Sequence, residues 1–141
     1  MTRFSRLDLM GVIATVLLAA GAEAQTFTTA AEVKPILTAT KPNWIAVREW
    51  GGQDLVYFTN LLSWRCGVVS VSYSVNGGDQ TLLPMEPCYE DTAQPNALLM
   101  ETVQPYITLP LGSVDTVSVF VTYDDDTPDQ AEYTRKSVLM P

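Results

Sequence analysis

The chain has 141 residues, with eight basic and 16 acidic side chains, a formal net charge of −8 and no histidine. Without histidine, the Ser-His-Asp and Cys-His catalytic arrangements are excluded, as are zinc and copper sites built on imidazole. An acidic surface repels phosphate backbones and anionic lipid headgroups, so we expect neither nucleic acid nor a membrane surface as a partner.

The N-terminus has the plan of a secretory signal peptide. Arg3 and Arg6 precede an apolar run over residues 9–20, and the pattern Ala-Glu-Ala follows at 22–24. A retained membrane anchor is the alternative, but the run is shorter than the roughly 20 residues that span a bilayer. We therefore predict that residues 1–24 are a signal peptide. The rest would be exported, to the periplasm or the cell exterior, with no membrane span.

Residues 25–141 have the length of a single domain. Thr29 and Glu32 have the spacing of a capping box, which predicts that a helix begins there. Pro35 limits this helix to a short or broken one, because proline lacks the amide that a helix interior uses. Pro42 ends it.

Two strands are expected next, over residues 44–50 and 55–64, joined by a turn at Gly51-Gly52. Apolar side chains occupy both parities of the longer run. It should therefore be a central strand covered on both faces, or carry a bulge. The sequence does not determine its pairing register with the first strand.

The first of these strands carries a candidate binding face. Trp44, Arg48 and Trp50 share one side of it if the strand is regular. A flat aromatic–arginine face could bind a sugar or a protein partner. The alternative is that the tryptophans pack in the core.

A hairpin organises the middle of the chain. Apolar residues alternate with serines in the strand predicted at 68–75, and Asn76-Gly77-Gly78 supplies residues that tolerate positive φ in a tight turn. With those three residues as the loop, the return strand at about 80–86 comes into register and Cys66 lies opposite Cys88. Because an exported chain passes through an oxidising compartment, we predict a structural disulfide between them.

The same register places Leu83 and Met85 on the face of Val71 and Val69. Two prolines deprive the return strand of amide donors, so it belongs at a sheet edge. Arg65, beside the first cysteine, is expected to pair with a surface acid.

The remaining residues alternate between polar connections and strands. Residues 89–104 form a polar connection in which one helical turn or a short strand stays open, and 106–109 is a brief strand. An alternating strand at 116–123 leads through the acidic turn 124–129 to a final strand at about 131–140. About seven strands with little helix predict an all-β antiparallel β-sandwich, of which an immunoglobulin-like topology is one form. A small β-barrel is the alternative.

The acidic turn is a weak calcium candidate through Asp124, Asp126, Asp129 and Glu132. Its spacing departs from the helix-loop-helix calcium pattern, since proline and aspartate occupy the positions of a ligand and of the essential glycine. We favour a solvated turn whose charge discourages edge-to-edge aggregation. No other metal site and no cofactor is predicted.

These features predict an exported, non-enzymatic binding or interaction module of the cell envelope, with an unidentified protein or glycan as partner. One alternative is a carbohydrate or small-ligand binder that uses the face of Trp44, Arg48 and Trp50. Another is an acidic inhibitor of an envelope enzyme, whose binding would weaken with salt. An unrecognised hydrolase is a further alternative, although a sandwich of this size leaves little room for a deep cleft.

Overall fold

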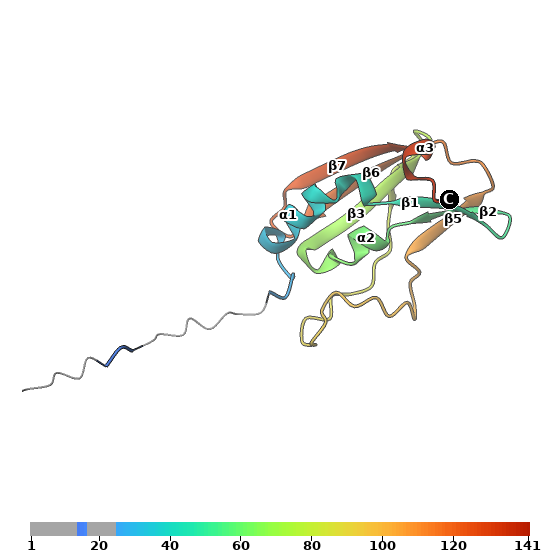
Figure 1. The fold of residues 1–141 in the computed structure, drawn as a ribbon. Coiled ribbons are helices and arrows are strands. Elements are labelled where there is room, and N and C mark those ends of the chain that lie inside the picture. Colours follow the sequence, from blue (N-terminus) through green and yellow to red (C-terminus); the bar gives the residue numbers. More distant parts are fainter. Residues whose placement is uncertain (1–13, 17–24) are drawn as a thin grey trace, which may run out of the picture.

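The computed structural model describes residues 14–16 and 25–141, and the second range folds into two antiparallel sheets with a few short helices (Figure 1). The predicted signal peptide, apart from residues 14–16, lies outside the described residues. One sheet has the order β1-β2-β5, with β1 (Ala46–Trp50), β2 (Gln53–Tyr57) and β5 (Tyr106–Pro110). The other has the order β4-β3-β6-β7, with β4 (Thr81–Leu82), β3 (Val68–Val75), β6 (Thr116–Tyr123) and β7 (Pro128–Thr134).

The predicted all-β fold with seven strands is confirmed. In the part of the chain that the structure describes, neither sheet closes on itself, so the barrel alternative is wrong. The strand order is related to that of an immunoglobulin constant domain, where the first, second, fifth and fourth strands form one sheet and the third, sixth and seventh form the other. Here β4 pairs with β3 instead, so the fourth strand extends the second sheet.

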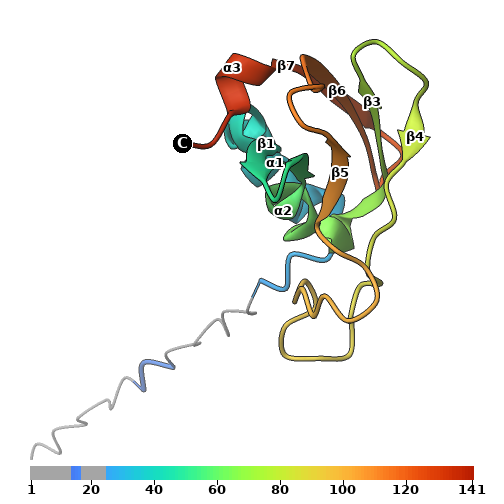
Figure 2. The same ribbon diagram turned by 90° about the vertical axis from the view of Figure 1, so that its right-hand side faces the viewer.

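The sheets and helices enclose one hydrophobic core. The helical elements are α1 (Ala30–Ala39), η1 (Lys41–Asn43), α2 (Thr59–Leu62), η2 (Arg65–Gly67) and α3 (Arg135–Val138). Helices α1 and α2 and the three-stranded sheet lie on the same side of the four-stranded sheet (Figures 1 and 2). Fully buried core residues come from both sheets and from α1 and α2: Val33, Leu37, Val47, Val56, Leu61, Val71, Val117, Val119 and Val121. Among the described residues, no helix is long and apolar enough to cross a bilayer.

Helix α1 begins at the predicted capping box. The Thr29 hydroxyl accepts a hydrogen bond from the Glu32 amide, and the Glu32 carboxylate accepts from the Phe27 and Thr28 amides. The first contact satisfies an amide that the first helical turn leaves unpaired, and the other two fix the residues that precede the cap. Pro35 lies inside the short helix without ending it. Since Pro35 is exposed, water can satisfy the carbonyl that its missing amide would have bonded.

Three predicted strand boundaries are wrong, and in two of them a helical turn replaces part of the strand. The run predicted at 55–64 ends as a strand at Tyr57 and continues as α2, which explains why apolar residues occur at both parities. The strand predicted at 131–140 ends at Thr134, where α3 begins. The strand predicted from residue 44 begins at Ala46, after η1. The central position expected of the second strand is confirmed, since β2 lies between β1 and β5.

The predicted hairpin register is confirmed by the pairing of Ser72 with Leu82 and by the disulfide between Cys66 and Cys88. Its return strand lies at the sheet edge as predicted but pairs over only two residues. Val69 does not share the inner face with Val71 as predicted. A β-bulge between Val68 and Ser70, where β3 pairs with β6, turns the Val69 side chain outward, and it is 57% exposed.

Candidate functional site

The outer face of the three-stranded sheet, turned away from the core, carries the best candidate site. In β1, Val47 is fully buried, so by strand alternation Arg48 and Trp50 point to the opposite, outer side. The pairing places Leu55 of β2 opposite Arg48, and places Tyr57 next to Tyr106 of β5. Three neighbouring strands therefore contribute aromatic and aliphatic side chains to one surface.

The side chains on this face form two stacked pairs. The Arg48 guanidinium lies 4.2 Å from the centroid of the Trp50 ring, and the Trp50 side chain is 61% exposed. The rings of Tyr57 and Tyr106 lie 5.2 Å apart at a tilted angle. Leu55 lies between the two pairs and is only 6% exposed, so the larger side chains cover it. Such contacts hold flat side chains in place at the surface.

A solvent-open groove of about 540 Å³ borders this face at the start of β1 and the end of β2. We call it the Arg48 groove. Its lining residues are Asn43, Trp44, Ile45, Ala46, Arg48, Tyr57, Thr59, Asn60 and Met140. The surface that these residues present to solvent is mostly apolar, with amide and hydroxyl groups at its margins. It therefore combines the two properties of a binding pocket, apolar area and a few fixed polar groups.

Arg48 is the single charged side chain in the lining of the groove. Within the described residues, Lys34, Lys41 and Arg135 form ion pairs, whereas Arg48 has no carboxylate within 4.0 Å. The groove is therefore locally positive on a chain whose net charge is −8. An unpaired guanidinium beside apolar surface favours a ligand that brings both an anionic group and apolar area.

The structure brings two of the three predicted face residues together. Arg48 and Trp50 are in contact, but Trp44 does not share their face. The Trp44 side chain is fully buried, and its indole nitrogen donates to the Leu37 carbonyl at 2.8 Å. Trp44 follows η1 rather than standing in β1, so strand alternation does not apply to it. Tyr57, which pairs opposite Ala46, contributes an aromatic ring to this side of the sheet instead.

The acidic turn does not gather its carboxylates around a common point. Asp124 accepts a hydrogen bond from the amide of Ala30 at 2.7 Å, at the start of α1. Asp129 pairs with Lys41 at 2.5 Å. Across the described residues, no three acidic or cysteine side chains lie together in an arrangement that could hold a metal ion. The turn therefore contacts α1 and η1. The sequence had led us to expect a turn surrounded by solvent.

Asp125 adds to this docking by pairing with Lys34. The hydrogen bond from Lys34 and a second from Thr127 lower the pKa of Asp125 to about 2. The acidic turn therefore uses its charge within the chain, to fix the helix on the sheet.

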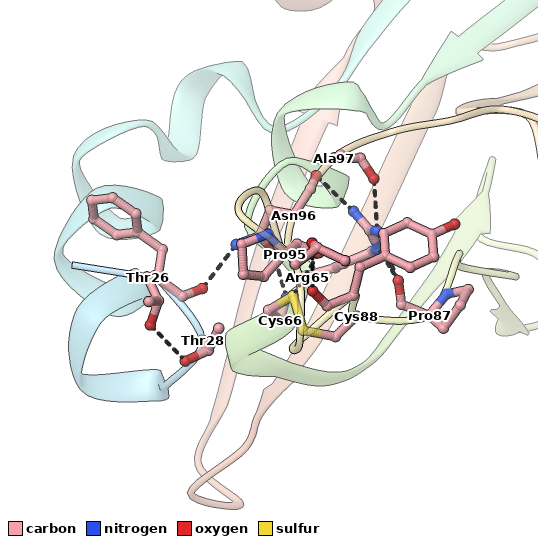
Figure 3. The surroundings of a disulfide bond; sticks show 12 residues. Thr26, Thr28, Arg65, Cys66, Pro87, Cys88, Pro95, Asn96 and Ala97 are labelled. Atoms are coloured by element: carbon pink, nitrogen blue, oxygen red, sulfur yellow. Dashed lines mark hydrogen bonds between the residues drawn. A yellow bond between two sulfur atoms is a disulfide. The ribbon is translucent and has the colours of Figure 1, made fainter. Parts of the chain in front are cut away.

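A second cation, Arg65, is almost completely buried beside the disulfide, with 3% of its surface exposed (Figure 3). It forms no ion pair with any residue that the structure describes. Instead it donates to backbone carbonyls at 2.8–3.2 Å, those of Leu62, Glu86, Pro87, Asn96 and Ala97. The expected pairing of Arg65 with a surface acid is therefore wrong. Burial lowers the pKa of its guanidinium, which nevertheless stays charged.

Glu86 is buried next to this arginine. It accepts hydrogen bonds from the Tyr89 hydroxyl at 2.8 Å and from the amides of Leu99 and Met100. Burial acts to raise the pKa of Glu86, but these hydrogen bonds outweigh it and lower the pKa below its ordinary value. Arg65, Glu86, Tyr89 and the disulfide form the Arg65 cluster, which holds residues 86–100 in place. Residues 89–104 contain neither of the elements left open by the sequence, a helical turn or a strand.

A buried ion pair links the three-stranded sheet to the start of α3. Asp54 is fully buried in β2, and Arg135 donates to its two carboxylate oxygens at 2.6 and 3.0 Å. Asp54 also accepts from the amides of Gly112 and Val114. The hydrogen bond from Arg135 lowers the pKa of Asp54 far below its ordinary value. Sequence reasoning missed this pair because its members lie far apart in the chain.

Comparisons of this chain with models of protein families, with curated proteins and with solved structures find no match.

Proposed function

We propose that this chain is an exported, non-catalytic binding module that holds a macromolecular partner in the cell envelope through the Arg48 groove. The observation that carries the proposal is an open apolar groove whose single charged side chain, Arg48, stacks on Trp50 but has no carboxylate partner among the described residues. Lys34, Lys41 and Arg135 are held in ion pairs and Arg65 by backbone carbonyls, whereas Lys136 is exposed outside the groove. An unpaired guanidinium on an apolar surface is typical of an interface residue.

The composition of the groove supports binding rather than catalysis. Its lining contains hydroxyl, amide and guanidinium groups but no carboxylate or cysteine, and the chain has no histidine. A hydroxyl nucleophile needs an adjacent base to activate it, and the lining residues do not supply one. Positioned recognition groups on a rigid sheet are sufficient for binding.

Two features support export. The N-terminal sequence has the order of a signal peptide, and Cys66 and Cys88 form a disulfide. Disulfides form and persist in oxidising compartments such as the periplasm and the cell exterior.

The proposal is tested by affinity capture from envelope extract of the native host. Wild-type protein is compared with Arg48→Gln, Tyr57→Ala and the control Lys136→Gln, whose side chain is exposed outside the groove. We expect wild type and Lys136→Gln to retain the same protein in quantitative mass spectrometry, and the two groove variants to lose it. Equal retention by all four proteins would refute the groove as the binding surface.

A carbohydrate is the second candidate partner, and the exposed ring of Trp50 favours it. Planar aromatic side chains can stack on sugar rings, and Tyr57 and Tyr106 extend the flat surface. Tryptophan fluorescence titrated with envelope glycans tests this candidate, with Trp50→Phe as the control that removes the responding ring. A fluorescence change that persists in Trp50→Phe, or no change with any glycan, would eliminate the idea.

A further inference from the structure

We propose that the Arg48 groove binds an extended peptide segment of a partner protein, with an aspartate or glutamate of that segment held by Arg48. This inference rests on the proposed binding function and names the chemistry of the partner. The carboxylate would accept two hydrogen bonds from the guanidinium, and a neighbouring apolar side chain would fill the groove between Ala46, Tyr57 and Met140.

The charge distribution indicates an anionic side chain in the ligand. The groove presents one positive group and no negative group, whereas the surrounding chain is strongly acidic. A guanidinium that stacks on an aromatic ring keeps N–H groups available for a carboxylate, and the stacking reduces the freedom it loses on binding. Arg48, at 4.2 Å from the Trp50 ring centroid, is held in this way.

The edge of β1 indicates a peptide rather than another anion. Strand β1 lies at the edge of its sheet, and the C-terminal segment of this chain already pairs there in parallel through Val47 and Leu139. The Met140 amide donates to the Val47 carbonyl at 2.7 Å, and Met140 also lines the groove. The backbone groups of β1 therefore accept an extended chain beside the groove.

This internal pairing is limited to one bridge, at Val47. A partner segment can therefore continue along β1 from this point, or take the place of residues 139 and 140. Main-chain hydrogen bonds to an edge strand supply affinity, and side chains that fit adjacent pockets supply specificity. In the proposed complex, the acidic residue against Arg48 supplies the specificity.

The test is selection of random dodecapeptides displayed on phage against purified protein expressed from the full sequence. We expect the selected peptides to be enriched in an acidic residue next to an apolar one. The best peptide and its amide counterpart, with Asp→Asn or Glu→Gln, are then synthesised and titrated by fluorescence polarisation. Loss of the peptide carboxylate should weaken binding at least about tenfold, since hydrogen bonds between charged groups are lost.

Variants of the protein test whether Arg48 binds the carboxylate of the peptide. Arg48→Gln should weaken binding of the acidic peptide at least about tenfold, and should weaken binding of the amide peptide much less, as in a double-mutant cycle. Arg48→Lys, which keeps the charge but loses the planar fork, should lie between. The control Lys136→Gln removes one exposed positive charge that does not line the groove, and should change affinity less than about twofold, since solvent and salt screen such a charge.

The outcomes separate this inference from the proposed function. Peptides that lack an acidic residue but whose binding depends on Tyr57 would refute the proposed contact between a ligand carboxylate and Arg48. The groove would remain the proposed binding surface. If no peptide is enriched and a glycan binds in a manner that depends on Trp50, the proposal that the ligand is a peptide is wrong. If no ligand of either kind depends on Arg48, Trp50 or Tyr57, both proposals are wrong.

Discussion

Arg48 and Arg65 carry the same side chain in opposite surroundings. Arg65 is 3% exposed, and its guanidinium is surrounded by backbone carbonyls from three segments of the chain. Arg48 lies at the surface over Trp50, in a groove without a carboxylate. The fold satisfies the hydrogen-bonding groups of Arg65. Most of the hydrogen-bonding groups of Arg48 stay available.

The difference separates a structural role from a binding role. A buried cation with satisfied donors holds its neighbours, because removing it leaves several carbonyls without partners in a dry environment. Arg48 is only partly buried and forms no ion pair among the described residues, so it contributes less to folding and can contribute to recognition. Changing both arginines to glutamine therefore gives a matched comparison, with opposite expected effects on stability and binding.

The largest effect on stability is expected for Arg65→Gln. The variant leaves several buried carbonyls without a donor, at about 1–3 kcal/mol each, so we expect the free energy of unfolding to fall by about 3–5 kcal/mol. Urea unfolding followed by circular dichroism measures this change. Arg65→Lys, which keeps the charge but cannot reach all the carbonyls, should recover only part of the loss. An Arg65→Gln variant as stable as wild type would remove the distinction between the two arginines.

The next largest effect is expected for removing the disulfide of the same cluster. Cys66 and Cys88 are separated by 22 residues in sequence. Closing a loop of this length stabilises the folded state by about 3 kcal/mol on the chain-entropy model. The double variant Cys66→Ser/Cys88→Ser should therefore unfold at lower urea concentration, to the same extent as the wild type in reductant. Identical unfolding of wild type with and without reductant would contradict this expectation.

A smaller, pH-dependent effect is expected for Glu86→Gln. The hydrogen bonds at Glu86 lower its pKa in the folded state below the ordinary value of 4.5. A carboxyl whose pKa is lowered by folding stabilises the protein above its ordinary pKa, and this contribution is lost as the pH falls. The substitution should therefore cost about 1–3 kcal/mol near neutral pH, where it disrupts buried hydrogen bonds.

The cost of Glu86→Gln should decrease as the pH falls below 4.5, because the wild-type carboxyl then becomes protonated as well. Urea unfolding of both proteins at a series of pH values from 7 down to 3 measures the difference. A difference that is constant across this series would show that the charge of Glu86 is not what stabilises the loop at residues 86–100.

The parts of the fold that depend on local sequence were predictable. The turn at Asn76-Gly77 has two residues at positive φ, and it sets the hairpin register and the disulfide from neighbouring residues alone. The capping box at Thr29 is equally local. Alternation in β6 is regular because the strand lies inside its sheet and buries one face along its whole length.

The parts that failed depend on partners distant in sequence. Val69 faces outward because of a bulge against β6, and Arg135 leaves the final strand at the point where it pairs with Asp54. The candidate site was half predicted. Arg48 and Trp50 follow from strand alternation, whereas Tyr57 required the register between β1 and β2, which the sequence left open.

The smallest effect on stability is expected for Arg48→Gln, the matched counterpart of Arg65→Gln. It removes a cation–π contact between the half-buried Arg48 and the exposed Trp50, so the free energy of unfolding should fall by only about 1 kcal/mol. The measurement is the same urea unfolding used for Arg65. If Arg48→Gln were as destabilising as Arg65→Gln, then Arg48 would be a structural residue and loss of binding in that variant would not identify a ligand contact. If it leaves stability intact and abolishes partner capture, the unpaired guanidinium is kept at the surface for recognition.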